Sequence, residues 1–171
     1  MKTSSIVPAI IFILSACLGA SAQRIPTFSQ YPSKVEKSRN IQVNLKSHKS
    51  ARMFRTNLRN AAKEGVNFAG HFVVSNWGCG TNCSQTAIID AHNGRVFFPD
   101  ILAGAAFGFC ELGDADEPIV YKPNSRLLVL YGFKGGELDK PHSKCGIYYL
   151  EWTGTKFKQV QFVEKKRTYT P

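Results

Sequence analysis

The residues of this sequence that are best suited to catalysis are cysteines and histidines. Four cysteines lie between residues 79 and 145, namely Cys79, Cys83, Cys110 and Cys145. A cysteine thiolate becomes a nucleophile when an imidazole that is near in space takes its proton. One interpretation is therefore a small cysteine-dependent hydrolase in which Cys79 attacks the substrate and His71 or His142 is the base.

Metal binding is a second chemistry that these residue types allow. A tetrahedral zinc set could be formed by Cys79, Cys83, His142 and Cys145, because three-residue gaps occur in structural zinc sites. Glu111, Asp114, Asp116 and Glu117 offer carboxylates for calcium, but their spacing does not match the 12-residue calcium loop. We interpret the acidic segment as a surface loop and expect no metal and no cofactor.

Oxidation of the four cysteines is the interpretation that we favour, because the chain carries an export signal. Four cysteines allow three pairings, and the sequence alone does not choose among them. We prefer Cys79–Cys83 with Cys110–Cys145, since the Gly-Thr-Asn segment between the first two can curl to bring them together. A bridged Cys79 has no thiolate, so we expect structural cross-links.

The export signal occupies the first 22 residues. Lys2 precedes an apolar stretch over residues 6–16, and Ala20-Ser21-Ala22 supplies small residues before a cleavage point. A second interpretation is a bacterial lipobox at residues 14–17, in which Cys17 is lipidated. No segment reaches the roughly 20 apolar residues of a transmembrane helix. We expect a periplasmic protein, or an outer-membrane lipoprotein if Cys17 is lipidated.

Positive charge is concentrated near the amino terminus. The chain has 22 Lys and Arg against 12 Asp and Glu, and residues 24–63 hold ten basic residues and one acidic residue, Glu36. A helix predicted over residues 49–63 carries Arg52, Arg55, Arg59 and Lys63. These side chains predict binding to an acidic protein partner, with an anionic envelope surface as the alternative. Nucleic acid is not expected, because export separates the chain from it.

Hydrophobic periodicity divides the rest of the chain. Residues 23–45 are predicted to be an extended lead-in with at most a short strand at 41–45, and residues 166–171 a polar tail. Gly65 is expected to end the helix.

Strands are expected at 68–77, 85–91, 95–98, 119–121, 126–131, 146–152 and 156–163. Asn93-Gly94 predicts a type I′ hairpin. The predicted fold is a single α+β domain over 46–165, mainly an antiparallel β-meander with one amphipathic helix and two disulfides.

One segment resembles a known group of proteins. Its residues Phe68-Ala69-Gly70-His71 are followed by Trp77-Gly78-Cys79-Gly80-Thr81-Asn82-Cys83. With the 87–96 hairpin and the 148–154 strand and turn, this segment is similar to a widespread group of small exported bacterial proteins of unknown function. The resemblance implies a bacterial envelope protein and no catalytic residue.

The function that we expect is non-enzymatic binding of another macromolecule in the bacterial envelope. An inhibitor or immunity protein that acts against a toxin or hydrolase of the periplasm is one example, because rigid β-scaffolds present binding loops well. Two alternatives stay open: the hydrolase described above, and a structural component whose basic helix faces anionic lipid.

Overall fold

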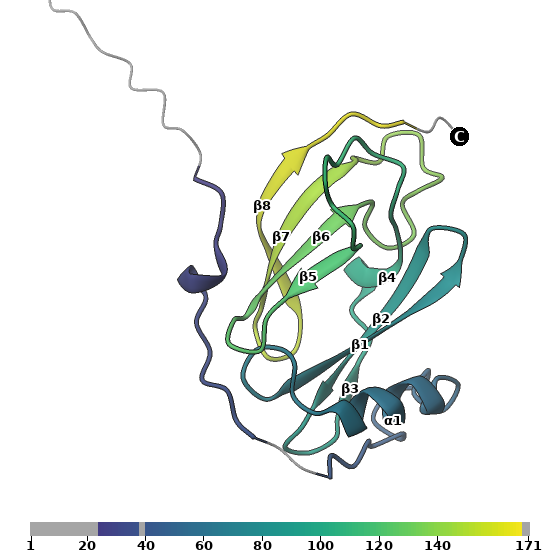
Figure 1. Ribbon diagram of the computed structural model, residues 1–171. Helices are drawn as coiled ribbons and strands as arrows, with labels where there is room; N and C mark the ends of the chain where they lie inside the picture. The colour runs from purple at the N-terminus through teal and green to yellow at the C-terminus, as the bar shows by residue number, and fades with distance from the viewer. Residues whose placement is uncertain (1–23, 38–39, 169–171) are drawn as a thin grey trace, which may run out of the picture.

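The chain folds into two antiparallel β-sheets that share a core, with one α-helix on the outer face of the first sheet (Figure 1). This computed structural model describes residues 24–37 and 40–168. The first sheet contains β1 (Phe72–Gly80), β2 (Cys83–Asp90), β3 (Val96–Phe97) and β4 (Ala103–Ala106). The second contains β5 (Ile119–Tyr121), β6 (Leu127–Gly132), β7 (Gly146–Trp152) and β8 (Phe157–Glu164). The mainly antiparallel α+β character predicted from the sequence is confirmed.

The single meander predicted from the sequence is wrong, because the strands divide between two sheets. Strand β2 lies at the centre of the first sheet, with β1 on one edge and both β3 and β4 on the other. The second sheet follows chain order, β5-β6-β7-β8. One helix of ten residues could not have covered the apolar face of a single eight-stranded sheet, so the second sheet supplies the missing cover.

The first sheet is buried on both faces. Ile88 points into the main core between the sheets, where it joins Leu128, Leu150 and Trp152 of the second sheet. Its neighbour Ile89 points the other way, into a smaller core beneath the helix. This double burial explains why residues 87–89 form a continuous apolar run instead of alternating with polar residues.

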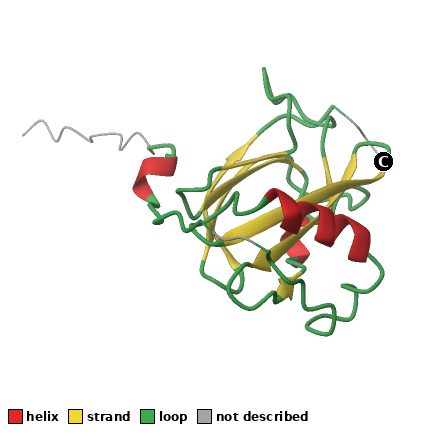
Figure 2. Cartoon of the chain, turned by 60° about the horizontal axis from the view of Figure 1, so that its bottom comes forward, coloured by secondary structure: helices red, strands yellow, loops and turns green. Residues whose placement is uncertain are grey.

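The helix α1 (Arg55–Glu64) starts six residues later than predicted from the sequence. Residues 49–54 form turns instead, with backbone bonds from Ala51 to His48 and from Met53 to Ser50 that close shorter rings than an α-helix does. The end of the helix at Gly65 is confirmed, and this glycine has a φ of 91°. Figure 2 shows α1 lying across the strands of the first sheet.

The hairpin predicted at Asn93-Gly94 is present, but its turn is not type I′. Of the four residues between Asp90 and Arg95, Gly94 alone has a positive φ, 71°, whereas a type I′ turn needs two. The Asp90 carboxylate accepts bonds from the His92 backbone N–H at 2.9 Å and from the Asn93 side-chain amide at 2.8 Å. These side-chain hydrogen bonds hold the turn, so a second residue with a positive φ is not needed.

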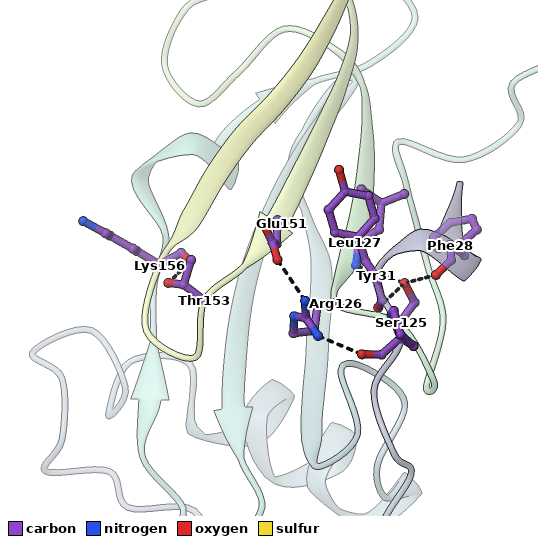
Figure 3. A network of polar contacts seen from close by, with 9 residues as sticks. Phe28, Tyr31, Ser125, Arg126, Leu127, Glu151, Thr153 and Lys156 are labelled. Atoms are coloured by element: carbon purple, nitrogen blue, oxygen red, sulfur yellow. Dashed lines mark hydrogen bonds and ion pairs between the residues drawn. The ribbon is translucent and has the colours of Figure 1, made fainter. Parts of the chain in front are cut away.

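The amino-terminal lead-in is fixed to the second sheet by side-chain contacts (Figure 3). Ser125 is fully buried, and its hydroxyl lies 2.9 Å from the Phe28 carbonyl oxygen and 3.1 Å from that of Tyr31. Arg126 donates to the Pro32 carbonyl oxygen and to Glu151 of β7. Lead-in residues therefore belong to the packed structure, although the short strand allowed for at 41–45 is absent.

Both ends of the chain lie partly beyond what the structure describes. The predicted signal peptide 1–22 and the lipidation site Cys17 fall outside the described residues. Within the described part, no helix is long and apolar enough to cross a membrane. Residues 166–168 of the predicted polar tail pair with residues 109–111, through bonds from Glu111 N–H to Lys166 and from Thr168 N–H to Phe109.

Candidate functional site

The disulfide pairing preferred from the sequence is confirmed. Cys79 and Cys83 are joined across the end of the β1–β2 hairpin, with their Cα atoms 5.1 Å apart. Cys110 and Cys145 join the segment after β4 to the residue before β7, with Cα atoms 5.9 Å apart. Two disulfides indicate an oxidising environment outside the cytoplasm.

The structure does not assemble the cysteine hydrolase. Cys79 is bonded to Cys83 and therefore has no thiolate. His71 directly precedes β1 whereas Cys79 is near its far end, and eight residues of extended strand span about 26 Å. His142 lies in the loop before β7, in the second sheet. Along β1, the proposed nucleophile is thus kept apart from His71, one of its two candidate bases.

Neither metal site considered from the sequence forms. The zinc set is ruled out in this state, because Cys79, Cys83 and Cys145 are all held in disulfides. In the acidic segment, Glu111 is paired with Lys166 at 3.0 Å. Among the described residues, one group of three metal-ligand side chains gathers, and it contains none of these residues.

The four basic side chains predicted to bind a partner are all exposed. Arg52, Arg55, Arg59 and Lys63, which we call the basic face, lie on α1 and in the turn before it. A neighbouring face of the helix buries Leu58 and Ala62 against the first sheet. None of the four basic residues forms an ion pair with an acidic residue of the described chain. Their charge is available to a partner.

A disulfide-closed loop ends the β1–β2 hairpin, and the strand that leads to it packs on the start of α1. Residues 78–83, which we call the hairpin tip, are exposed as far as residue 82 and are closed by the Cys79–Cys83 bond. Just before the tip, the Trp77 ring packs on Phe54 at 4.8 Å and on Phe98 at 6.4 Å between centroids. Phe54 directly precedes Arg55, so this aromatic contact joins the tip to the start of α1. A hollow of about 320 Å³ beside the tip is lined by residues that include Trp77, Asn82 and Phe107.

The remaining cluster of functional side chains contains two histidines and a glutamate. Glu36, His71 and His92, which we call the imidazole cluster, have ligand atoms within 4.8 Å of one another. Glu36 Oε2 lies 2.7 Å from His92 Nε2, and the two imidazole rings stack with centroids 4.0 Å apart and planes 7° apart. Asp90 Oδ1 lies 3.9 Å from His71 Nε2.

Local electrostatics set the charge states in this cluster. The hydrogen bond from His92 lowers the pKa of the Glu36 carboxyl below its ordinary value, which keeps Glu36 ionised. Partial burial, followed by the proximity of His92, lowers the pKa of His71. His71 is therefore a neutral imidazole at about pH 7, with a ring nitrogen lone pair.

Sequence reasoning identified only one member of the imidazole cluster. His71 was considered as a base for Cys79, and neither Glu36 nor His92 was selected. Glu36 and His92 are 56 residues apart, so no local spacing marks them as partners. Gly70 is the residue that could have indicated the cluster. A Cβ at this position would lie 2.6 Å from the Lys34 carbonyl oxygen, so only glycine lets the lead-in pass beside His71.

Comparisons with known proteins add no assignment: no protein-family model, no curated protein and no solved structure matches this chain.

Proposed function

We propose that this chain is a non-enzymatic protein of the bacterial envelope that binds an acidic partner protein, in the manner of an inhibitor or immunity protein. The observation that carries the proposal is the basic face, four exposed cations without acidic partners in the described chain; the hairpin tip is joined to the start of α1 through the packing of Trp77 on Phe54. The compartment proposed is the periplasm, or the outer membrane if Cys17 carries lipid.

Rigidity of the two surface features supports binding. The Cys79–Cys83 bond closes the hairpin tip, and the packing of Trp77 on Phe54 fixes the tip relative to α1. A loop that is already ordered loses little conformational entropy when it binds, so more of the contact energy appears as affinity. The absence of a thiolate at Cys79 removes the chemical basis of the hydrolase alternative.

The test is a matched pair of charge reversals. The double variant Arg55→Glu/Arg59→Glu changes the basic face, and Lys156→Glu/Lys158→Glu makes the same change in net charge on exposed residues at the turn between β7 and β8 and the start of β8. The immobilised protein is used to capture exported proteins of its own organism, and the affinity of the captured protein is then measured with purified components. We expect an acidic protein whose affinity falls about tenfold or more for the first variant only.

Salt and lipid distinguish the alternatives. Affinity for the partner should fall steeply with added salt, because the Debye length shortens from about 10 Å at 0.1 M to about 3 Å at 1 M. Equal binding by both double variants, or binding that ignores salt, would contradict the proposal. Sedimentation with anionic vesicles that is lost only in Arg55→Glu/Arg59→Glu, with no protein captured, would instead support the lipid-facing structural role.

A further inference from the structure

The imidazole cluster combines three side chains that come from distant parts of the chain. Glu36 belongs to the lead-in, His71 directly precedes β1, and His92 lies in the turn after β2. Two imidazoles and one carboxylate form the set of three protein ligands that leaves a fourth position open on a tetrahedral metal ion. About half of each of the Glu36 and His92 side chains is exposed, so an ion can reach them from solvent.

We propose that Glu36, His71 and His92 bind a divalent transition-metal ion of the zinc class, with the fourth position open to water or to a ligand from outside. The nitrogen donors favour zinc, nickel or copper over calcium and magnesium, which prefer oxygen. This site uses none of the residues of the basic face or the hairpin tip, so it does not depend on the proposed binding of an acidic partner.

The backbone can stay in place, but the two stacked imidazole rings must tilt apart so that their in-plane lone pairs meet at one ion. Metal–nitrogen and metal–oxygen bonds of about 2.0–2.1 Å in a tetrahedron place ligand atoms about 3.3 Å apart. The ligand atoms of the cluster are within 4.8 Å of one another, and Glu36 and His92 are already 2.7 Å apart. Metal binding replaces the hydrogen bond between Glu36 and His92: the neutral His92 ring then carries its hydrogen on Nδ1, so that the Nε2 lone pair is free for the metal, and no proton has to leave.

The backbone around the three ligands is fixed by hydrogen bonds. Glu36 N–H donates to the Gly70 carbonyl oxygen at 2.8 Å, which holds the lead-in beside His71. Ala91 N–H donates to the His71 carbonyl oxygen at 3.0 Å, and Asp90 accepts from His92 N–H at 2.9 Å. These bonds tie the segments that carry Glu36, His71 and His92 to one another, so little backbone ordering is left for the metal to impose.

The glycines next to the cluster serve the same arrangement. Gly70 has a φ of 87° and Gly94 a φ of 71°, both in the region that side chains disfavour. A Cβ at Gly94 would collide with the Gln42 carbonyl oxygen, as one at Gly70 would with that of Lys34. The lead-in therefore passes both glycines at close range, and this approach brings Glu36 to the two histidines.

The experiment is calorimetric titration of Zn²⁺ into the purified protein, at a pH about one unit above the ordinary histidine pKa and after dialysis against a chelator. We expect one Zn²⁺ per chain. Loss of a residue that only supports a metal ligand weakens metal affinity about 10- to 100-fold. Loss of a direct ligand should cost at least as much, so His71→Ala, His92→Ala and Glu36→Gln should each lower the affinity for Zn²⁺ about tenfold or more. His142→Ala, which removes an exposed histidine outside the cluster, should bind as the unchanged protein does.

Two further measurements keep the result unambiguous. Nitrogen-15 NMR of the histidine rings in the unchanged protein should show Zn²⁺-dependent shifts at His71 and His92 and none at His142, whether or not a variant folds poorly. Ca²⁺ should produce no heat, since the set is rich in nitrogen. No Zn²⁺ binding, equal weakening by His142→Ala, or equal affinity for Ca²⁺ would each overturn the proposal.

Discussion

The buried hydroxyl of Ser125 lies 2.9 Å from the carbonyl oxygen of Phe28, 97 residues earlier in the chain. It also accepts a bond from Leu127 N–H at 3.1 Å (Figure 3). This one side chain joins the lead-in to the first residue of β6, and the same lead-in then carries Glu36 to the imidazole cluster.

Ser125→Ala is expected to lower the free energy of unfolding by about 1–3 kcal/mol, because it removes the hydroxyl that accepts from the buried Leu127 N–H and that bonds to the lead-in. Urea denaturation measures the change. Ser29→Ala, which removes an exposed hydroxyl of the lead-in, is the control and should have almost no effect. Equal stability of the Ser125 variant and the unchanged protein would show that the contact contributes nothing.

Much of the fold could be predicted from local pattern. The bounds of the strands at 119–121 and 146–152 agree with the structure, because aromatic and β-branched residues between turns mark them well. Strand β4 was missed, since Ala103-Gly104-Ala105-Ala106 has neither residue type. Ala105 and Ala106 form a strand because they pair with β2 and are buried. Both the pairing and the burial depend on residues distant in the sequence, so the local pattern does not reveal them.

The surface features and the imidazole cluster differ in the same way in how far the sequence predicts them. The basic face was predicted from residue types and spacing, and one of three possible disulfide pairings was preferred; the structure agrees on the exposure of the first and on the preferred pairing. The imidazole cluster depends on the path of the lead-in past Gly70, a contact between residues far apart in the chain. Periodicity carries no information about such a path, so Glu36 and His92 could not be paired in advance.

Gly132 and Gly154 provide a second prediction, because both have a positive φ but only one is crowded. A Cβ at Gly132 would collide with the Ala106 carbonyl oxygen, beside the bridge between Ala106 and Phe133. Gly154 has no neighbour within 4 Å of such a Cβ. Gly154→Ala should lower the unfolding free energy by about 1–2 kcal/mol from the backbone alone, and Gly132→Ala by a further 1–3 kcal/mol, roughly, from overpacking.

Thermal or urea denaturation of both glycine variants gives the comparison. The difference between them isolates the steric contact, because the positive φ is common to both sites. Equal losses of stability would mean that the chain around Ala106 can move aside at no cost, and that the contact between the sheets there is loose.

The two disulfides should contribute unequally to stability. They close segments with sequence separations of 35 and 4 residues. In the chain-entropy model, a loop of about 35 residues corresponds to about 3.8 kcal/mol and the short loop to about 2 kcal/mol. Replacing Cys110 and Cys145 by serine should therefore destabilise the protein more than replacing Cys79 and Cys83, as measured by denaturation under non-reducing conditions. The opposite order would assign the hairpin tip the larger role in stability.

Tyr148 should make stability depend on alkaline pH. Its side chain is buried, its hydroxyl donates to the Lys144 carbonyl oxygen, and burial, with Glu137 and Glu164 nearby, raises the pKa of the phenol well above its ordinary value. In the unfolded chain the phenol ionises near pH 10, roughly, while the folded protein keeps it neutral. Ionisation thus stabilises the unfolded state. The contribution of Tyr148 to the stability of the folded protein is fully present below about pH 10 and is lost progressively as the pH rises above that value.

Tyr148→Phe removes this dependence together with the hydrogen bond. At about pH 7 the variant should be less stable than the unchanged protein by about 1 kcal/mol, the net value of one hydrogen bond. One unit above the ordinary tyrosine pKa, the unchanged protein should have lost about 1.4 kcal/mol that the variant does not lose, so the two stabilities should become equal within that unit and the variant should be slightly the more stable at its upper end. Urea titrations at several pH values measure the difference directly. A difference that stays constant over this range would show that Tyr148 ionises equally well in the folded protein, and that the core around it admits a charge.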